Sequence, residues 1–165
     1  NSIFVQFEAE IERILTVPDG RRSNIDDVWL YLHLMFELIW KYRFFYRDLN
    51  DLLSRNRKLE LHFKQILGHK IKVATQLCED LRSEQSLEAS DAEINAMATN
   101  MVVVATYWLS YEYVQNPRKY TEQQAMADAL ARGCYQVLSQ LAPYLRGETR
   151  ILFNKLSGDY LKKLK

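Results

Sequence analysis

Glycine, proline and cysteine are all scarce in this sequence, which has 5 glycines, 3 prolines and 2 cysteines among its 165 residues. So few turn-forming residues argue against a chain of many short strands, and they favour long helices. Two cysteines exclude a disulfide-rich framework, and neither Cys78 nor Cys134 has metal-ligand spacing to a histidine or to the other cysteine. Both lie within apolar helical patterns, which predicts small core residues in a reducing compartment.

Features of secreted, membrane-spanning and nucleic-acid-binding chains are also missing. No signal peptide is visible, and no uncharged run is long enough to cross a bilayer. The formal net charge is only +1, so the chain as a whole has no strong attraction to nucleic acid. We therefore expect a cytoplasmic protein with no membrane partner.

Catalytic motifs are absent too: there is no Gly-x-Ser-x-Gly, no phosphate-cradling glycine loop and no Cys/His dyad. His33 and Glu37 lie four residues apart on one predicted helix face, which could be half of a metal site. The Glu-x-x-His pairs of a ferritin-like bundle are missing, so we favour a pocket or core histidine. His62 and His69 share a face with Gln65 and indicate a polar helix surface. The sequence predicts no enzyme, no metal site and no cofactor.

Hydrophobic periodicity with the spacing of helices runs through the whole chain. Hydrophobic residues make up 48% of it and charged residues 26%, a globular composition, and the length suits one domain, 1–165. Because apolar residues recur at i, i+4 and i+7, we expect an all-α fold of about seven helices and no strands. The predicted helices span residues 3–17, 25–44, 46–54, 56–83, 91–114, 121–142 and 147–163.

Capping residues and the few prolines mark the helix boundaries. Asn24, Asn56 and Thr121 can cap the helices that follow them, and Ser90 or Asp91 can cap helix 91–114. The middle of that helix could be a buried strand by β-propensity alone, but the caps and the length favour a helix. The predicted breaks are Pro18-Asp19-Gly20, Asn116-Pro117 and Pro143.

The stretch 24–55 carries two of the three tryptophans and a dense run of other aromatic residues. Helix 25–44 is apolar nearly all round, which predicts a central position, buried on several sides. Arg47 and Asp48 follow Tyr46 near a bend, and we expect one of the two charges to be partly buried. Two roles stay open, a structural ion pair that fixes the bend and an anchor for a polar ligand group, and we favour the first.

Two later helices indicate a contact between two copies of the chain. Helix 91–114 is apolar nearly all round in its middle, and helix 121–142 is rich in small residues, whereas one chain covers only one side of each. A simple core role is the alternative. The Ala129–Gly133 spacing matches a helix-turn-helix, but nothing around Gly133 looks like a turn. The expected dimer-interface residues are Val104, Trp108, Ala125, Ala129, Gly133 and Val137.

A known family is suggested by the segment Trp40-Lys41-Tyr42-Arg43-Phe44-Phe45-Tyr46-Arg47-Asp48-Leu49, followed by Leu52-Leu53 and Leu61-His62-Phe63. Together with the order of helices, this segment resembles the C-terminal regulatory domain of the TetR family of bacterial repressors. The opening Asn1-Ser2-Ile3-Phe4 looks like the point just after that family's DNA-binding helices. The resemblance therefore implies that the helix-turn-helix is absent, and that a homodimer would contact operator DNA only through that missing domain.

The resemblance also implies an allosteric mechanism. A small apolar or amphipathic effector would fill a pocket between helices 25–44, 56–83 and 91–114. Helix 3–17 would be the linker and lever to the DNA-binding helices, provided that the effector binds the two states with different affinity. Segment 24–114 would be the pocket core, and 91–142 would hold the dimerisation helices.

The pocket residues are chosen for apolar bulk with one titratable group. The expected ligand-binding residues are Trp29, His33, Phe36, Trp40, Phe63, Met101 and Trp108. Helix 56–83, beside them, has an apolar stripe of Leu59, Phe63, Ile66, Leu67, Lys70, Val73, Ala74 and Leu77. The alternatives are a helical scaffold or protein-interaction module without a ligand, and a helical-bundle metalloprotein.

Overall fold

The computed structural model describes residues 2–16, 24–119 and 123–163. Within these ranges the chain forms eight α-helices and two 3₁₀ turns, with no strand beyond one isolated antiparallel bridge between Leu87 and Leu145. The all-helical prediction is confirmed. The α-helices are α1 (Ser2–Leu15), α2 (Ile25–Lys41), α3 (Arg43–Arg47), α4 (Leu49–Arg55), α5 (Arg57–Ser83), α6 (Asp91–Gln115), α7 (Gln123–Ser139) and α8 (Gly147–Lys163). The 3₁₀ turns are η1 (Pro117–Lys119) and η2 (Ala142–Tyr144).

Two short helices, α3 and α4, replace the single helix expected over 46–54. The backbone leaves the helical region at Tyr42 (φ −106°, ψ 29°) and again at Asp48 (φ −111°, ψ 25°). The chain therefore bends at both ends of α3, and α4 then leads into α5.

Two later helices, α6 and α7, end close to the predicted proline breaks. α6 ends two residues before Pro117, which opens η1, and α7 ends before η2, which contains Pro143. Both breaks are confirmed, although α7 ends at Ser139, three residues before the expected end. The predicted break Pro18-Asp19-Gly20 and the predicted cap Thr121 lie outside the described residues.

Local capping accounts for the starts of α2 and α5. Asn24 Oδ1 accepts a hydrogen bond from the Asp27 backbone N–H at 3.0 Å, and Asp27 Oδ2 accepts one from the Asn24 N–H at 2.9 Å. Asn56 Oδ1 accepts from the Leu59 N–H at 3.1 Å. Each bond satisfies a backbone donor that the helix itself leaves free, and both predicted caps are confirmed.

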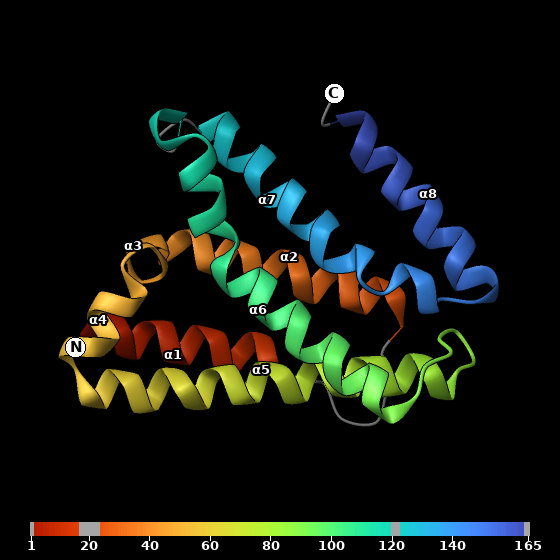
Figure 1. Cartoon of the computed structure of the whole chain (residues 1–165), viewed down its shortest axis with the longest axis horizontal. Coiled ribbons are helices and arrows are strands. Elements are labelled where there is room, and N and C mark those ends of the chain that lie inside the picture. The colour runs from red at the N-terminus through yellow and green to blue at the C-terminus, as the bar shows by residue number, and fades with distance from the viewer. Residues whose placement is uncertain (1, 17–23, 120–122, 164–165) are drawn as a thin grey trace.

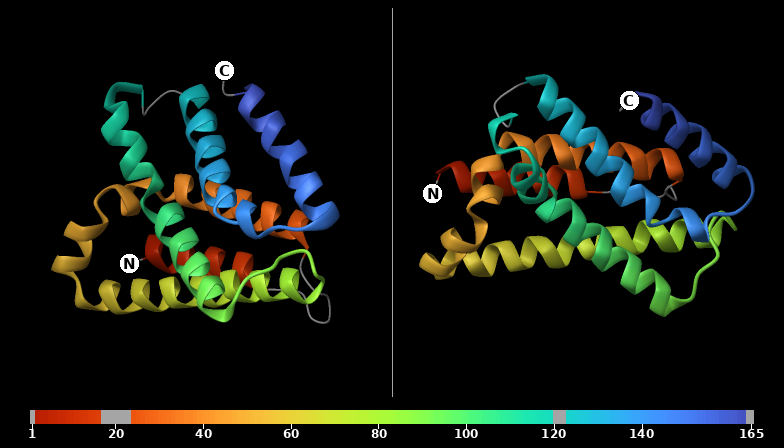
Figure 2. Two further views of the ribbon diagram at one scale, coloured as in Figure 1. Left: turned by 45° about the vertical axis from the view of Figure 1, so that its right-hand side comes forward. Right: turned by 45° about the horizontal axis from the view of Figure 1, so that its top comes forward.

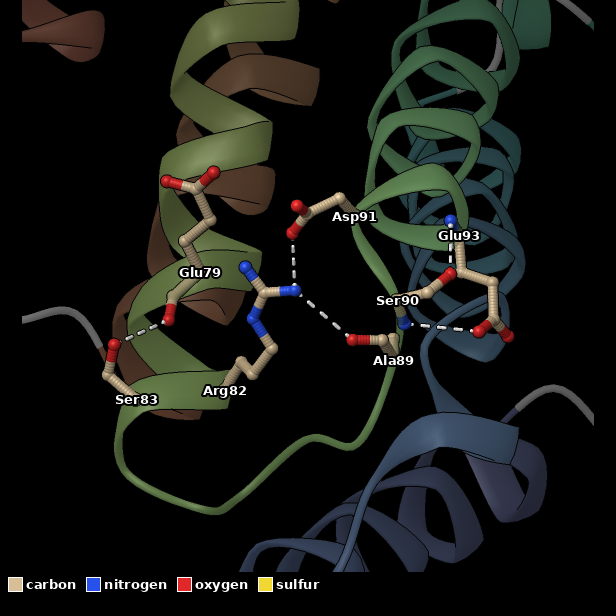
Figure 3. Close-up of polar contacts among 7 residues, drawn as sticks. All are labelled: Glu79, Arg82, Ser83, Ala89, Ser90, Asp91 and Glu93. Atoms are coloured by element: carbon tan, nitrogen blue, oxygen red, sulfur yellow. Dashed lines mark hydrogen bonds and ion pairs between the residues drawn. The ribbon is translucent and has the colours of Figure 1, made fainter.

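The junction of α5 and α6 is held by side chains from both helices (Figure 3). Ser90 caps α6, because its Oγ accepts from the Glu93 N–H at 3.1 Å while the Glu93 carboxylate accepts from the Ser90 N–H at 3.1 Å. Arg82, in the last turn of α5, donates to Asp91 Oδ1 at 2.7 Å and to the Ala89 carbonyl at 3.2 Å. The loop between the two longest helices therefore has a defined geometry.

Figure 1 shows α1 and α5 running side by side, α6 crossing them diagonally, and α7 and α8 beyond it on the other side. The two further views in Figure 2 agree with this arrangement. α6 packs on α5 and α7, and α2 packs on α1 and α7. α8 contacts mainly α7 and lies farthest from α1 and α5.

Helix α2 contributes to both main clusters of buried side chains, which confirms its predicted central position. One cluster joins α2 to α5, α6, α7 and α8, and it includes Phe36. The other joins α2 to α1, α3 and α5, and it includes Ile39, Phe7 and Tyr46. Because one helix belongs to both clusters, a movement of α2 would disturb the packing on each side.

The small residues of α7 allow close packing within one chain. A Cβ atom added at Gly133 would lie 2.6 Å from Trp108 Cδ1 and 2.9 Å from Phe36 Cε1, closer than van der Waals contact allows. Trp108 Nε1 donates to the Ala129 carbonyl at 2.8 Å. Gly133 is therefore needed so that α7 can approach α6 and α2.

Candidate functional site

An apolar cavity of about 70 Å³ lies where α1, α2, α5, α6 and α7 meet. Ile14 and Leu15 of α1 form part of its wall, and Met35 of α2 and Met101 of α6 form another part. Ligand pockets of drug-sized molecules are larger, about 300–1,000 Å³. Methionine side chains are unbranched and adapt their shape readily, so the cavity can widen by changes of rotamer at these two residues.

One charged residue, Lys70 of α5, lines this apolar cavity. It is 5% exposed, and its Nζ donates to Tyr46 Oη at 3.3 Å. An ammonium group has three N–H donors, and in the described part of the chain Lys70 has no other hydrogen bond and no ion pair. Burial lowers the pKa of Lys70 to about 7, because an apolar surrounding disfavours the charged form.

Tyr46 is the buried member of the sequence Tyr46-Arg47-Asp48, at 2% exposure. Its ring packs edge-on against Phe7 of α1 and Phe63 of α5, with centroids 5.9 Å apart in each pair. Burial raises the pKa of the Tyr46 hydroxyl, which therefore stays a neutral partner for Lys70. The tyrosine thus links the lysine of the cavity to the packing of α1.

The prediction that Arg47 or Asp48 is partly buried is wrong, because both side chains are exposed. Arg47 Cζ lies 4.9 Å from the centroid of the Tyr113 ring, a cation–π contact between α3 and α6. No ion pair involves either residue among the residues that the structure describes. The helix direction after the bend at Tyr42 turns the tyrosine inward and the two charges outward. Their role as a ligand anchor stays a prediction.

Polar contacts hold the outer side of α1 against its neighbours. Glu8 Oε1 lies 2.6 Å from His62 Nδ1, and Glu12 Oε1 lies 3.2 Å from His69 Nδ1. The two histidines that indicated a plain polar surface therefore face carboxylates of α1. The sequence spacing indicated that His62 and His69 share one helix face, but it did not indicate that this face packs against α1.

A second set of contacts joins α1 to the end of α2. Glu10 Oε1 accepts hydrogen bonds from Lys41 Nζ at 2.7 Å and from Tyr42 Oη at 2.8 Å. These bonds lower the pKa of Glu10, the one from Lys41 most, because both donors favour the ionised carboxylate. α1 is thus attached to α5 and α2 by groups on its surface as well as by its apolar face.

The seven predicted ligand-binding residues do not gather at one place. Met101 lines the cavity, whereas Phe36 and Phe63 lie in the two core clusters and are not on its wall. Trp40 and Trp108 line two grooves beside α7, which share no lining residue with the cavity. For these residues, ligand binding stays a prediction, and the geometry favours Met101 alone as a cavity residue.

Trp29 and His33 lie at the junction of α2 with α8. The Trp29 ring centroid is 4.8 Å from that of Tyr160, and His33 Nε2 makes a short hydrogen bond with Tyr160 Oη. On its other side, His33 Nδ1 lies 3.9 Å from Cys134 Sγ. Burial lowers the pKa of His33, although Glu37 opposes the shift. His33 therefore joins α2 to α8, and its role as the titratable group of a ligand pocket stays a prediction.

Three of the six predicted dimer-interface residues, Ala129, Gly133 and Val137, are buried within the single chain. The other three, Val104, Trp108 and Ala125, keep part of their surface exposed. A dimer role for the six stays a prediction. The burial of Ala129, Gly133 and Val137 shows that the small residues of α7 mainly allow its contact with α6 and α2 in the same chain.

A groove of about 450 Å³ lies between α6 and α7, and the half-buried ion pair of Arg132 with Glu112 forms part of its lining. Arg132 Nε and Nη2 donate to the two carboxylate oxygens of Glu112 at 2.7 and 2.9 Å. Glu112 is 6% exposed. The bidentate geometry fixes α7 on α6, because the forked guanidinium matches the planar carboxylate.

The sequence pattern placed Lys70 only in an apolar stripe and Tyr46 only in the segment that suggested the family, and it did not indicate the pair Glu112–Arg132. The signal for Lys70 was its place in the apolar stripe of α5, where a charged residue is unusual. Among the described residues no group of three or more histidine, cysteine, aspartate or glutamate side chains could hold a metal ion. No helix in the same part of the chain is long and apolar enough to span a membrane.

Comparisons with known proteins agree with the fold. A model of one protein family, described as "TetR: Bacterial transcriptional repressor", matches residues 6–153. Among solved structures, a TetR-family transcriptional regulator from Marinobacter aquaeolei VT8 superposes with a TM-score of 0.84. It is 25% identical in sequence, and the match covers 96% of this chain and 74% of that one. A comparison with curated proteins gave no match.

Proposed function

The chain belongs to the TetR family of bacterial transcriptional repressors, and from this premise we propose that it binds a small apolar or amphipathic effector in the cavity of Met35 and Met101. The observation that carries the proposal is that Ile14 and Leu15 of α1 form part of the cavity wall. A molecule that enlarges the cavity would push directly on α1. In the family resemblance described above, α1 is the helix next to the DNA-binding helices.

The attachment of α1 supports a role as a movable lever. Its contacts with α5 and α2 include Glu8–His62, Glu12–His69 and Glu10–Lys41, in which every partner lies at least partly exposed. Ion pairs at a surface contribute only about 0–1 kcal/mol each. At these polar contacts a ligand that shifts α1 therefore breaks no costly interaction, and the main resistance comes from the apolar face of α1. The shift changes operator binding if the effector prefers one of the two positions.

Filling the cavity from within tests the effector site. Ala105→Leu places a larger apolar side chain on the cavity wall, so we expect it to abolish the thermal stabilisation that small apolar compounds give the unaltered protein. The free protein should gain up to about 1.5 kcal/mol of stability, because cavity volume contributes about 24 cal/mol per Å³. Differential scanning fluorimetry with a panel of apolar compounds measures both effects.

Ala96→Leu is the matched control, since Ala96 is exposed on the same helix. It should leave compound-induced stabilisation unchanged. An effector site in this cavity is excluded if Ala105→Leu responds to the same compounds as strongly as the control does.

The dimer expected of a TetR-family regulator is proposed to form through the exposed side of α6. Val103, Tyr107, Tyr111 and Val114 follow one another at helical spacing there, and their exposed fractions are 49%, 42%, 54% and 75%. Such a contiguous apolar stripe is typical of a protein–protein contact. The stripe adjoins the groove between α6 and α7, which Trp108 lines. Trp108, one of the predicted dimer-interface residues, therefore stays part of the proposed interface.

Charge on this stripe should separate the two copies. We expect Tyr107→Glu to reduce the mass measured by light scattering from about twice 19.5 kDa to about 19.5 kDa, because a buried, unpaired carboxylate strongly disfavours association. Thr99→Glu, at an exposed position one helical turn before the stripe begins, should leave the dimer intact. A monomer in the unaltered protein, or a dimer unaffected by Tyr107→Glu, would show that this surface is not the interface.

A further inference from the structure

The charge of Lys70 has no partner of opposite sign among the described residues. Its only hydrogen bond there is to the neutral hydroxyl of Tyr46, at 3.3 Å, and the rest of the cavity wall is apolar apart from Tyr31. A buried ammonium group with two unused N–H donors is unfavourable unless an anion pairs with it. A lysine at this position therefore lowers stability, and its chemistry points to a ligand.

From this arrangement we propose that the effector is an amphipathic carboxylate, whose anionic head pairs with Lys70 while its apolar tail fills the cavity beside Met35 and Met101. The inference rests on the effector site proposed above and adds the chemical class of the ligand. One ammonium group matches one monoanion, whereas a phosphate dianion would need several further donors, and beside Lys70 the described cavity wall offers only the Tyr31 hydroxyl. The four-carbon stem of lysine is flexible enough to turn the head from Tyr46 to the ligand.

Pairing with a carboxylate also changes the contacts of α3. When Lys70 turns to the ligand, Tyr46 loses its hydrogen bond, and Tyr46 packs on Phe7 of α1 at 5.9 Å. The head of the ligand thus acts on α1 through Tyr46, while the tail acts on α1 through Ile14 and Leu15. Both ends of one molecule therefore bias the same helix.

Matched probes test the charge preference. Butanoate, hexanoate and octanoate are compared with the alcohols and primary amines of equal chain length by isothermal titration calorimetry, on the whole protein and on two variants. We expect the best carboxylate to bind the unaltered protein about tenfold more tightly than its alcohol, since a hydrogen bond to a charged group is worth about that factor. Lys70→Met should remove this preference. Lys72→Met, an exposed lysine two residues along α5, should keep it.

Proton uptake is a second and independent readout. Burial holds the pKa of Lys70 at about 7, so at pH 8 the amine is mostly neutral and must gain a proton when it pairs with a carboxylate. The other titratable groups facing it are Tyr46 on α3 and Tyr31 across the cavity on α2. Titrations at pH 8 in buffers of different ionisation enthalpy should show close to one proton taken up per carboxylate bound, and none for Lys70→Met.

The outcomes separate the two proposals. If alcohols and carboxylates bind the unaltered protein equally well, the anionic ligand class is wrong while the effector site stands. If carboxylates are preferred but Lys70→Met keeps that preference, the anion binds elsewhere and the role of Lys70 is wrong. If no probe of any charge binds, and the compound panel gives no stabilisation either, the effector site itself is wrong.

Discussion

Replacing Lys70 with methionine is expected to raise the free energy of unfolding by about 3 kcal/mol at pH 6 and by less than about 1 kcal/mol at pH 9. Burial lowers the pKa of Lys70 from 10.5 to about 7, which is about 5 kcal/mol of unfavourable charge burial at pH 6. Loss of the hydrogen bond from Lys70 to the buried Tyr46 hydroxyl offsets about 1–3 kcal/mol of the gain.

The sign of the pH dependence follows from the depressed pKa. Between pH 7 and 10.5 the unfolded chain holds a proton on Lys70 that the folded chain has released, so the stability of the unaltered protein rises with pH across this window. Below pH 7 both states are protonated and the full penalty applies. The methionine variant has no such group, and its advantage therefore shrinks by about 2–3 kcal/mol between pH 6 and pH 9.

Urea unfolding followed by circular dichroism at the two pH values measures these differences. Lys72→Met is the control, because that lysine is exposed and its replacement should change stability by no more than about 0.5 kcal/mol at either pH. If Lys70→Met gave the same stability as the unaltered protein at pH 6, the ammonium group would not be buried in an apolar site as the structure has it.

The second large effect concerns the ion pair between α6 and α7. Arg132→Met should lower the free energy of unfolding by about 3–4 kcal/mol, since it leaves the Glu112 carboxylate buried without its partner. The Glu112 side chain is 7% exposed and that of Arg132 is 40% exposed, so water reaches only the arginine. Because Arg132 is partly exposed, we expect a loss of stability below the largest losses known for fully buried ion pairs.

A double variant separates the loss of a partner from the loss of an attractive contact. Glu112→Leu together with Arg132→Met removes both charges, and we expect it to be much more stable than Arg132→Met alone. Arg118→Met, an exposed arginine just after α6, should unfold at the same urea concentration as the unaltered protein. A double variant as unstable as Arg132→Met would mean that packing of the arginine stem, and not charge, holds α7 on α6.

Helix order and helix caps could be predicted because they depend on residues close together in the chain. Asn24, Asn56 and Ser90 each bond to a backbone group three residues away, so the sequence pattern contains the whole interaction. The site could be predicted only in outline. The expected pocket helices do enclose the cavity, but α1 and α7 also contribute to its wall, and a single-sequence pattern does not reveal which helices converge.

Contacts could not be predicted where the partner of a residue lies far away in sequence. His33 contacts Tyr160, which is 127 residues distant on α8. Gly133 indicated close helix packing correctly, but a small residue does not tell whether the neighbour belongs to the same chain or to a second copy. For Tyr46, Arg47 and Asp48, the bend at Tyr42 decides which side chain turns inward, and no local pattern specifies that angle.

The positions of the three tryptophans have a spectroscopic consequence. Trp29 lies against α8, Trp108 lies between α6 and α7, and Trp40 lines the small groove beside α7; none of them is on the wall of the cavity. A molecule bound in the cavity would not quench indole emission by direct contact. Any change in intrinsic fluorescence on binding would instead report a rearrangement of helix junctions. Tryptophan emission can therefore be used to follow movements that pass from the cavity to these junctions.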